Sequence, residues 1–459
     1  MACSNTTKPS YSKGSSSITT QPNVIFILVD DMGFGDIGYN GSDIATPNLD
    51  QLAQQGMKLD RNYVYPVCSP TRAALLSGQS PLDMGITGPI DDHSSLPEDV
   101  KIMPEYFKEI GYETYMVGKW HLGLSKTSSW PTAKGFDSYY GFLGGWIDFY
   151  THVFAGGLDW QRDGKTIKEE GHATDLLTNE AIRIIELDRN KPFLMYLAYN
   201  APHSRIQHPP VYSGLNSYPE ITNRSVYAEM VTHMDAGIGK VVQSLGDNSM
   251  LENTIIIFSS DNGGAAHFGA SNGELRGGKR SAFEGGIRVP GLISWKDNIK
   301  AGSTLEQPIA IHDWLPTLLE AVGGDENSIK NPYGQSMWPA ISKNIDIKKA
   351  PVVIGATDNL SVIKWPFKLV YLTDPETKTS THQLYNVVND PTEQTDLSIE
   401  LHDLTQSLLE QIETMPVPEV NRLEPAFNNS PRYFDPKIPD HDQRHTSFKE
   451  PWAEAAIRD

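Results

Sequence analysis

Short, uninterrupted apolar runs are the clearest pattern along the chain. The first covers residues 23–29 (Asn-Val-Ile-Phe-Ile-Leu-Val), is rich in β-branched side chains and shows no polar alternation. Such a run predicts a strand that is buried on both faces of a parallel sheet. Runs of the same kind predict further strands at residues 113–117, 193–199, 254–259 and 291–295.

Segments with helical spacing of apolar residues lie between these runs. They predict helices at residues 48–55, 70–76, 103–110, 174–188, 225–245 and 312–322. Strands that alternate with helices indicate an α/β domain with a large, mostly parallel central sheet flanked by helices. We expect this domain to cover residues 21–345.

The pattern changes after about residue 344. Short strands at residues 352–355, 367–372 and 381–386 are separated by polar turns, and residues 396–415 form a helix candidate. These elements predict a smaller α+β unit with an antiparallel sheet over residues 346–459, ending in an extended tail rich in proline and charge. A polar leader at residues 1–20 is predicted to be disordered.

The charge of the chain limits its partners. Its 459 residues include 38 Lys and Arg against 57 Asp and Glu, a formal net charge of −19, which disfavours nucleic acid as a partner. No apolar run approaches the length of a membrane span. Of the two cysteines, Cys3 lies in the leader, so we expect the folded body to hold only Cys68 and no internal disulfide. Two interpretations of Cys3 stay open: the lipidated cysteine of a bacterial lipoprotein, or an incidental tail residue.

Acidic side chains follow two of the predicted buried strands. Asp30 and Asp31 come directly after the first, and Asp261 and Asn262 follow the strand at residues 254–259. The carboxyl ends of parallel strands gather at one edge, and adjacent carboxylates repel each other unless a cation neutralises them. All donors are oxygens, which favours a hard cation such as Ca²⁺ or Mg²⁺ over zinc. Each cluster alone is also typical of a turn or helix cap, but the pair favours a shared metal ion.

Cys68 lies just before a predicted helix. Ser69 suits the N-cap and Pro70 the first helical position. A side chain at residue 68 would therefore meet free backbone N–H groups and the positive end of the helix dipole, which suits an anionic nucleophile. Arg72, one turn further on, can reach back towards it. The alternative is an ordinary buried cysteine.

Cations and imidazoles follow other strands. Lys119 and His121 are two residues apart, so on an extended segment they face the same way, which suits anion binding and proton transfer. Taken as an isolated pair, they are better interpreted as a solvated lysine and a structural histidine. His203 follows the strand at residues 193–199, and Lys279 lies in a glycine-rich stretch. Each of the last two is a weak signal alone.

A substrate rim is predicted at residues 144–152. Trp146 offers an aromatic face for a sugar, and Asp148 and His152 offer partners for hydroxyls, with plain packing an equal alternative. Weaker rim candidates are Asp91, Asp92, His93 and Arg205, whereas His208 and His267 are interpreted as bystanders, although either could touch substrate.

Two motifs resemble the signatures of type I, formylglycine-dependent sulfatases of the alkaline phosphatase superfamily. Residues 68–78 (Cys-Ser-Pro-Thr-Arg-Ala-Ala-Leu-Leu-Ser-Gly) resemble the first signature, and residues 111–123 resemble the second, Gly-Tyr-x-Thr-x-x-x-Gly-Lys-x-His-x-Gly. Both are complete, and the similarity runs from about Asn23 to about Asn386. Arylsulfatase B-like enzymes are the nearest relatives that can be named.

The resemblance implies a role for each matched residue. Cys68 would be oxidised to formylglycine by a sulfatase-maturing enzyme, and its hydrate would form a covalent sulfo-enzyme intermediate. The remaining roles are Ca²⁺ binding by Asp30, Asp31, Asp261 and Asn262 beside residue 68, orientation of the hydrate by Arg72, sulfate binding by Lys119 and Lys279, protonation of the leaving alcohol by His203, and release of the sulfate by His121.

The resulting expectation is a sulfuric ester hydrolase that acts on a sulfated carbohydrate, such as the algal galactan carrageenan, in the periplasm or at the surface of a bacterium. Cations focused in one cleft would let an acidic protein bind this anion. Alternatives are a glycosaminoglycan or aryl sulfate substrate, a phosphodiesterase or phosphonate hydrolase of the same superfamily, and a non-catalytic protein that binds sulfated glycans. A zinc phosphatase is disfavoured because the donors are all oxygens.

Overall fold

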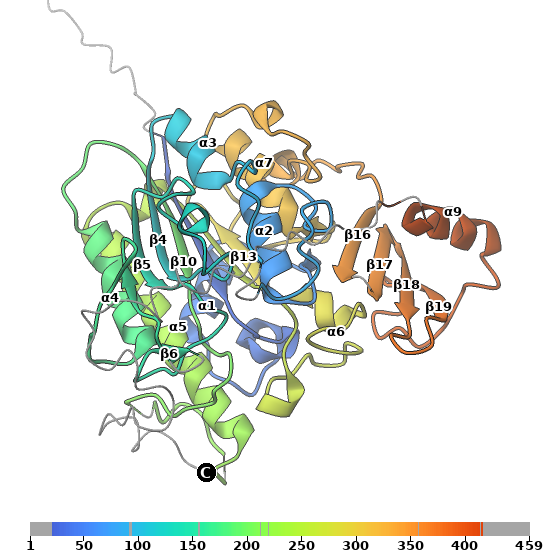
Figure 1. Cartoon of the computed structure of the whole chain (residues 1–459), viewed down its shortest axis with the longest axis horizontal. Coiled ribbons are helices and arrows are strands. Elements are labelled where there is room, and N and C mark those ends of the chain that lie inside the picture. The colour runs from blue at the N-terminus through green and yellow to red at the C-terminus, as the bar shows by residue number, and fades with distance from the viewer. Residues whose placement is uncertain are drawn as a thin grey trace, which may run out of the picture.

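The computed structural model of the chain describes residues 21–90, 94–154, 157–211, 213–218, 220–356, 358–413 and 415. Over this part the main body is an α/β domain around a ten-stranded sheet, with helices on both faces (Figure 1). The predicted leader with Cys3, the tail from residue 416, and the rim candidates Asp91, Asp92 and His93 lie outside the described residues.

The centre of the sheet is parallel, as predicted. Its strands, in spatial order, are β11 (Thr254–Ser260), β1 (Asn23–Val29), β10 (Phe193–Ala198), β4 (Glu113–Lys119) and β5 (Ser138–Phe142). The first four match the apolar runs. Strand β5 was not predicted, because its sequence Ser-Tyr-Tyr-Gly-Phe contains a glycine and no aliphatic run.

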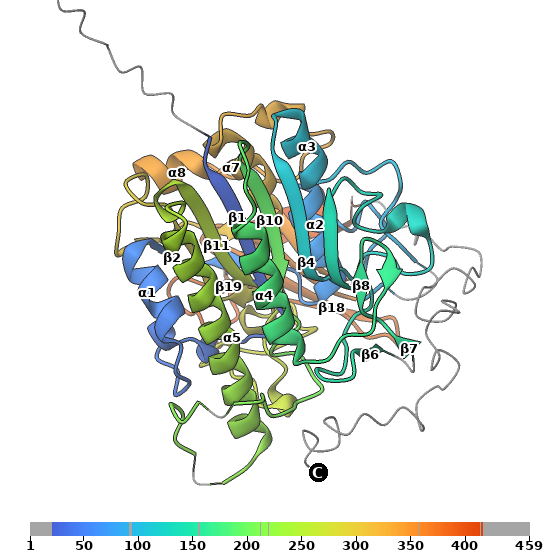
Figure 2. The same ribbon diagram turned by 90° about the vertical axis from the view of Figure 1, so that its left-hand side faces the viewer.

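Each central strand is buried on both faces. In β1, Val24, Phe26 and Leu28 pack in one core and Ile25, Ile27 and Val29 in the other, which explains the unbroken run. The first core is covered by α2 (Cys68–Ser77), α3 (Met103–Glu109), α7 (Trp314–Ala321) and α8 (Trp338–Lys343). The second is covered by α1 (Pro47–Gln55), α4 (Ala173–Ile185) and α5 (Asn223–Asp247), and the last two lie in front of the sheet in Figure 2.

Both flanks of the sheet include antiparallel pairs of strands. Beside β11, β13 (Gly291–Ser294) runs antiparallel and is followed by β2 (Met57–Leu59) and β14 (Ser303–Leu305). Beyond β5, the hairpin of β8 (Gln161–Arg162) and β9 (Lys165–Thr166) forms the other flank. The strand predicted at residues 291–295 therefore exists, but its carboxyl end points away from the edge where β1 and β11 end.

The described part of the C-terminal unit is a four-stranded antiparallel sheet with one helix packed on it (Figure 1). Its elements are β16 (Val352–Ala356), β17 (Asn359–Lys364), β18 (Phe367–Thr373), β19 (Ser380–Asn386) and α9 (His402–Glu413). The antiparallel sheet was predicted, whereas β17 was not. The predicted helix start at residue 396 is wrong, because Asp396 Oδ1 instead accepts hydrogen bonds from the backbone N–H groups of Leu384 and Ser398. We propose residues 344–351, after α8, as the connection between the two units.

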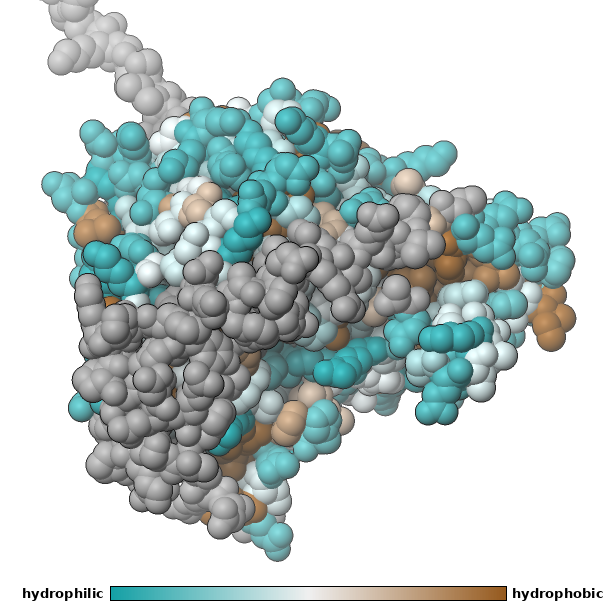
Figure 3. Space-filling view, in the orientation of Figure 1, coloured by the Kyte–Doolittle hydropathy of each residue, from teal (hydrophilic) through white to brown (hydrophobic). Residues whose placement is uncertain are grey.

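The described surface is mostly hydrophilic on the face shown in Figure 3, especially over α3 and the neighbouring loops. Among the described helices, none has the length and apolar character needed to cross a bilayer.

Candidate active site

The ends of three strands of the parallel core bring five predicted side chains together. Asp30 and Asp31 follow β1, Asp261 and Asn262 follow β11, and Lys119 is the last residue of β4. All five are buried. Their convergence follows from the parallel order of the strands, since every carboxyl end then reaches the same edge of the sheet.

Helix α2 places Cys68 beside this cluster. The helix begins at Cys68 with Val67 as its N-cap, so the predicted N-cap role of Ser69 is wrong. The Ser69 hydroxyl donates to the His121 carbonyl (2.9 Å) and accepts from the Ile90 N–H (2.9 Å), which ties the helix start to two loops. Burial raises the pKa of the Cys68 thiol, although Lys119 and other nearby cations oppose the shift. A neutral thiol is a poor nucleophile, so the unmodified side chain is not suited to attack.

Each carboxylate of the cluster is matched by a cation. Lys119 Nζ lies 2.5 Å from Asp30 Oδ2, and Lys279 Nζ lies 2.6 Å from Asp31 Oδ1. Arg72, one helical turn after Cys68, donates to Asp261 Oδ2 (2.8 Å). Its Nη1 donates to the Lys119 carbonyl (3.0 Å) and to the hydroxyl of Tyr196 in β10 (3.3 Å). Arg72 was predicted to reach back towards residue 68, and the hydrogen bonds of its guanidinium are instead with Asp261, Lys119 and Tyr196.

The charges of this cluster alter the acidity of its carboxyl groups. Burial, together with the neighbouring Asp261, raises the pKa of Asp30 to about 8, although Lys119 opposes the shift. Burial would also raise the pKa of Asp31, but His203 and Lys279 hold it below its usual range. Carboxylates this crowded and this dry are stabilised by a bound cation.

The donor set fits a hard divalent cation. Asp30 Oδ1 and Asn262 Oδ1 are buried and have no hydrogen-bond partner within the described chain. Asn262 Nδ2 donates to Asp31 Oδ1 (2.7 Å), which holds the amide against the carboxylates. Asp30, Asp31 and His203 each offer a ligand atom within 4.8 Å of the others. Unpaired buried oxygens from carboxylates and an amide are the ligands that Ca²⁺ prefers.

His121 faces Cys68 with a defined tautomer. Its Nδ1 lies 3.1 Å from Cys68 Sγ, and its Nε2 lies 3.1 Å from the Ile90 carbonyl. A carbonyl oxygen only accepts, so we assign the proton to Nε2, which leaves the Nδ1 lone pair directed at residue 68. Burial lowers the pKa of His121 well below its ordinary value, so the ring is neutral. A Cβ at Gly145 would lie 2.7 Å from this ring, so only glycine leaves room for it.

A cavity of about 670 Å³ opens onto Cys68. Its floor includes Asp31, His121, His203 and Lys279, and its walls include Trp146, Phe154, His267, Phe268 and Arg280. Three of its lining residues, Asp31, His121 and Arg280, have positive φ values of 68°, 56° and 74°. Strained backbone of this kind gathers at functional sites, where the surrounding structure holds side chains in place.

The cavity wall partly matches the predicted rim. Trp146 lines it and packs edge-on against Phe154, with the Arg205 guanidinium 5.8 Å from the Trp146 ring. His267, interpreted from sequence as a bystander, also lines it. Arg280 was missed, and the signal that could have found it is its place next to Lys279 in the same glycine-rich stretch.

Asp148 and His152 are placed elsewhere by the structure. Asp148 accepts hydrogen bonds from the backbone N–H groups of Tyr150 and Thr151, and its second oxygen accepts from Gln207. His152 is buried, stacks on Trp160 at 4.4 Å between ring centroids, and has Nε2 3.0 Å from the Gly171 carbonyl. Neither lines the cavity, so the packing alternative accounts for both.

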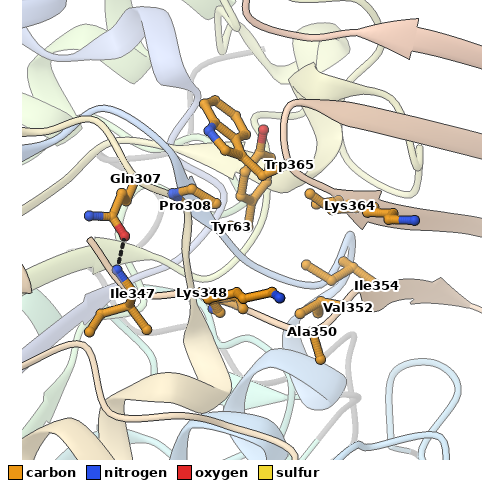
Figure 4. A pocket seen from close by; sticks show the side chains of 13 residues that line it. Tyr63, Gln307, Pro308, Ile347, Lys348, Ala350, Val352, Ile354, Lys364 and Trp365 are labelled. Carbon is orange, nitrogen blue, oxygen red and sulfur yellow. Dashed lines mark hydrogen bonds between the residues drawn. The ribbon is translucent and has the colours of Figure 1, made fainter.

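A second cavity lies between the main body and the small sheet, away from these residues (Figure 4). Its volume is about 290 Å³, and Tyr63, Trp365, Lys348 and Lys364 contribute to its lining. Gln307 accepts a hydrogen bond from the Ile347 N–H at its margin. None of the predicted site residues that the structure describes contributes to this cavity.

Comparisons with known proteins all find sulfatases. A family model described as Sulfatase matches residues 22–324. The chain is 38% identical over 341 residues to arylsulfatase J of Mus musculus, covering 71% of this chain and 57% of that protein. It is 32% identical over 357 residues to N-acetylgalactosamine-6-sulfatase of Homo sapiens, covering 72% and 67%. The chain thus spans well under the full length of these curated relatives.

Among solved structures, the chain is similar to Ps i-CgsB in complex with k-i-k-neocarrahexaose. The two are 31% identical with a TM-score of 0.80, and the match covers 92% of this chain and 97% of that one. The similarity therefore includes most of the C-terminal unit as well as the main body.

Proposed function

The chain belongs to the sulfatase family, and from that premise we propose that it hydrolyses sulfate esters of a carbohydrate, with a galactan of the carrageenan class as substrate. The observation that carries the proposal is the position of Cys68. Its side chain lies at the base of the cavity, at the start of α2, beside the strand-end carboxylates and 3.1 Å from His121 Nδ1.

The charge of the cluster suits an anionic substrate once a cation is bound. Among the described residues, three carboxylates (Asp30, Asp31 and Asp261) pair with three cations (Lys119, Lys279 and Arg72), so the cluster is formally neutral. A divalent ion on the four predicted ligands would add two positive charges. A sulfate monoester and one ionised hydroxyl would balance them, which resolves how a −19 protein binds a sulfated polymer.

We propose that a sulfatase-maturing enzyme oxidises Cys68 to formylglycine, so that Sγ in this structure marks the place of the hydrate oxygens. When present, the hydrate would supply one hydroxyl that attacks sulfur and a second that expels sulfate, while Ca²⁺ would favour ionisation of the hydroxyl and polarise the sulfate. Lys119 and Lys279 would bind the sulfate oxygens, and Arg72 would hold Asp261 and the base of α2 in position.

Two histidines would move protons on opposite sides of the sulfate. His121 Nδ1, with its lone pair directed at residue 68, would accept the proton whose loss releases the sulfate. His203 Nδ1 donates to the Ser204 carbonyl (2.5 Å), so the neutral ring has its lone pair on Nε2, which lies 3.6 Å from Asp31. To protonate the leaving alcohol, Nε2 would first take up a proton and the ring would become an imidazolium. Burial lowers the pKa of His203 to about 4, Asp31 opposes the shift, and an anionic substrate would add to the effect of Asp31.

Carrageenan is favoured as substrate by the relative that binds k-i-k-neocarrahexaose, a carrageenan oligosaccharide, over nearly the whole length of both chains. The aromatic wall at Trp146 suits the face of a galactose ring. The second candidate is a sulfated hexosamine of a glycosaminoglycan, supported by the similarity to N-acetylgalactosamine-6-sulfatase. We further propose a periplasmic or cell-surface location, where such polymers are met.

The deciding experiment is sulfate release from a panel of defined substrates. It contains carrageenan oligosaccharides, chondroitin disaccharides with sulfate at known positions, 4-nitrophenyl sulfate and 4-nitrophenyl phosphate. We expect the highest kcat/KM on a carrageenan oligosaccharide. Preference for a chondroitin disaccharide would select the second candidate, faster release of phosphate than of sulfate would contradict a sulfatase, and binding without release would indicate a glycan-binding protein.

Replacing Arg280 by alanine should weaken the binding of multiply sulfated oligosaccharides. Arg280 is an exposed cation on the cavity wall, where it can reach a neighbouring sulfate of a polymer. Loss of one charged hydrogen bond should raise KM about tenfold for a carrageenan oligosaccharide, with little change for 4-nitrophenyl sulfate. Lys364→Ala, at the second cavity, is the matched control. Equal effects on both substrates would contradict this role.

A further inference from the structure

A second cluster of metal-ligating side chains lies away from the cavity, where α4 begins against α5. His172 is the N-cap of α4, Asp175 lies in its first turn, and His233 projects from α5. One ligand atom of each lies within 4.8 Å of the other two. His233 Nε2 is 3.1 Å from Asp175 Oδ1. Two imidazoles and one carboxylate therefore converge on a single point.

The state of His172 points to a ligand at this position. Its side chain is 4% exposed, and neither of its ring nitrogens has a hydrogen-bond partner within the described part of the chain. Buried polar groups are nearly always hydrogen-bonded, so two ring nitrogens without a partner indicate that a ligand absent from this structure binds there. Its ring plane is 88° from that of His233, with centroids 5.2 Å apart.

Neighbouring aromatics hold the His172 ring in place. Phe149 stacks on it at 5.2 Å with 16° between planes, and Tyr150 packs edge-on at 5.0 Å. A ligand side chain that is held rigidly loses little entropy on metal binding.

We propose that His172, Asp175 and His233 bind one divalent transition-metal ion, with zinc as the ion best suited to the site. Mixed imidazole and carboxylate ligands select zinc and its neighbours over Ca²⁺. The carboxylate and amide oxygens that follow β1 and β11 instead select a hard cation such as Ca²⁺. The side chains of Asp175 and His233 are 33% and 13% exposed, which leaves a path from solvent and a fourth position for water.

The proposed site lies next to the segment that carries Trp146. The Ala173 N–H, at the start of α4, donates to the Phe149 carbonyl (2.8 Å), and residue 149 belongs to the segment that carries Trp146 on the cavity wall. A metal ion bridging α4 and α5 would therefore fasten the base of this segment to the long helix behind it. The active-site residues themselves would not contact the ion.

Zinc binding to the full chain tests the proposal. The protein is stripped with EDTA, saturated with Ca²⁺ to fill the strand-end cluster, and titrated with Zn²⁺ by calorimetry, with metal content measured by mass spectrometry. We expect one zinc per chain and at least a 100-fold weaker Kd in His233→Ala. His382→Ala, which removes an exposed histidine from β19, and Asp31→Asn, which alters the strand-end cluster, should both leave the zinc affinity unchanged.

His172→Phe keeps the test decisive if alanine variants fold poorly. Phenylalanine preserves the packing between Phe149 and Tyr150 but has no ligand nitrogen, so the metal-free Tm should match that of the wild type while zinc binding is lost. Co²⁺ should give an absorption band of a tetrahedral site in the wild type only. Absence of zinc binding in the wild type, or unchanged binding in both His172→Phe and His233→Ala, would overturn the proposal whether or not the chain cleaves sulfate esters.

Discussion

Alanine in place of Cys68 is expected to lower kcat by about 10⁴-fold or more on every sulfate ester, because it removes the group that we propose as the precursor of the nucleophile. Lys119 and Lys279, the proposed sulfate-binding cations, remain in place, so the Kd of a carrageenan oligosaccharide should change less than about threefold. Turnover is measured as released sulfate, and binding is measured by calorimetry on the same preparation.

Cys3→Ala is the matched control for this substitution, since it removes the other cysteine of the chain from the leader. Mass spectrometry of the peptide that contains residue 68 should detect formylglycine in the wild type and in Cys3→Ala. Near-wild-type turnover in Cys68→Ala would refute the assignment of residue 68 as the nucleophile.

The second large effect is expected at Lys368, which joins the small sheet to the main body. Its Nζ lies 3.0 Å from Glu284 Oε1 in α6 (Glu284–Ile287) and 2.8 Å from Glu393 Oε1, and all three groups are buried. Lys368→Met would leave Glu284 and Glu393 buried together without the cation that bridges them, while Arg288 Nη1 stays 3.7 Å from Glu284 Oε2. Breaking a buried ion pair from one side costs about 3–5 kcal/mol, and we expect a loss of that size in the free energy of unfolding.

Urea unfolding followed by tryptophan fluorescence measures this loss. Lys364→Met, an exposed lysine on β17, should change the free energy of unfolding by less than about 0.5 kcal/mol. Burial raises the pKa of Glu393, Glu284 adds to the shift, and Lys368 opposes it. The double variant Lys368→Met with Glu393→Gln should therefore recover part of the loss. Equal stability of the two single methionine variants would mean that the buried ion cluster does not hold the units together.

Local pattern predicted the floor of the site because its geometry follows from strand direction. An apolar run locates the end of a buried strand to within a residue, and parallel strands deliver their ends to one edge. The sequence alone therefore predicts that Asp30, Asp31, Asp261 and Asn262 converge. Arg72 followed from helix periodicity, since it lies one turn after Cys68.

Features that depend on distant partners could not be predicted. His152 has the residue type and sequence neighbourhood of a sugar-binding residue. Its ring instead stacks on Trp160, which directly precedes β8. Ser69 has the sequence signature of an N-cap. Its hydroxyl instead donates to the His121 carbonyl and accepts from the Ile90 N–H. An apolar run also carries no direction, so nothing in residues 291–295 indicated that β13 would run antiparallel.

Gly145 has a wider consequence. The segment that carries Trp146 supplies the wall on which a sugar would rest, while the groups around residue 68 are fixed by strand ends and by α2. These two parts of the molecule pack against each other at Gly145 and the ring of His121. As long as that position stays glycine, the sequence of the neighbouring loop can change to fit a different sulfate ester without displacing the groups around residue 68.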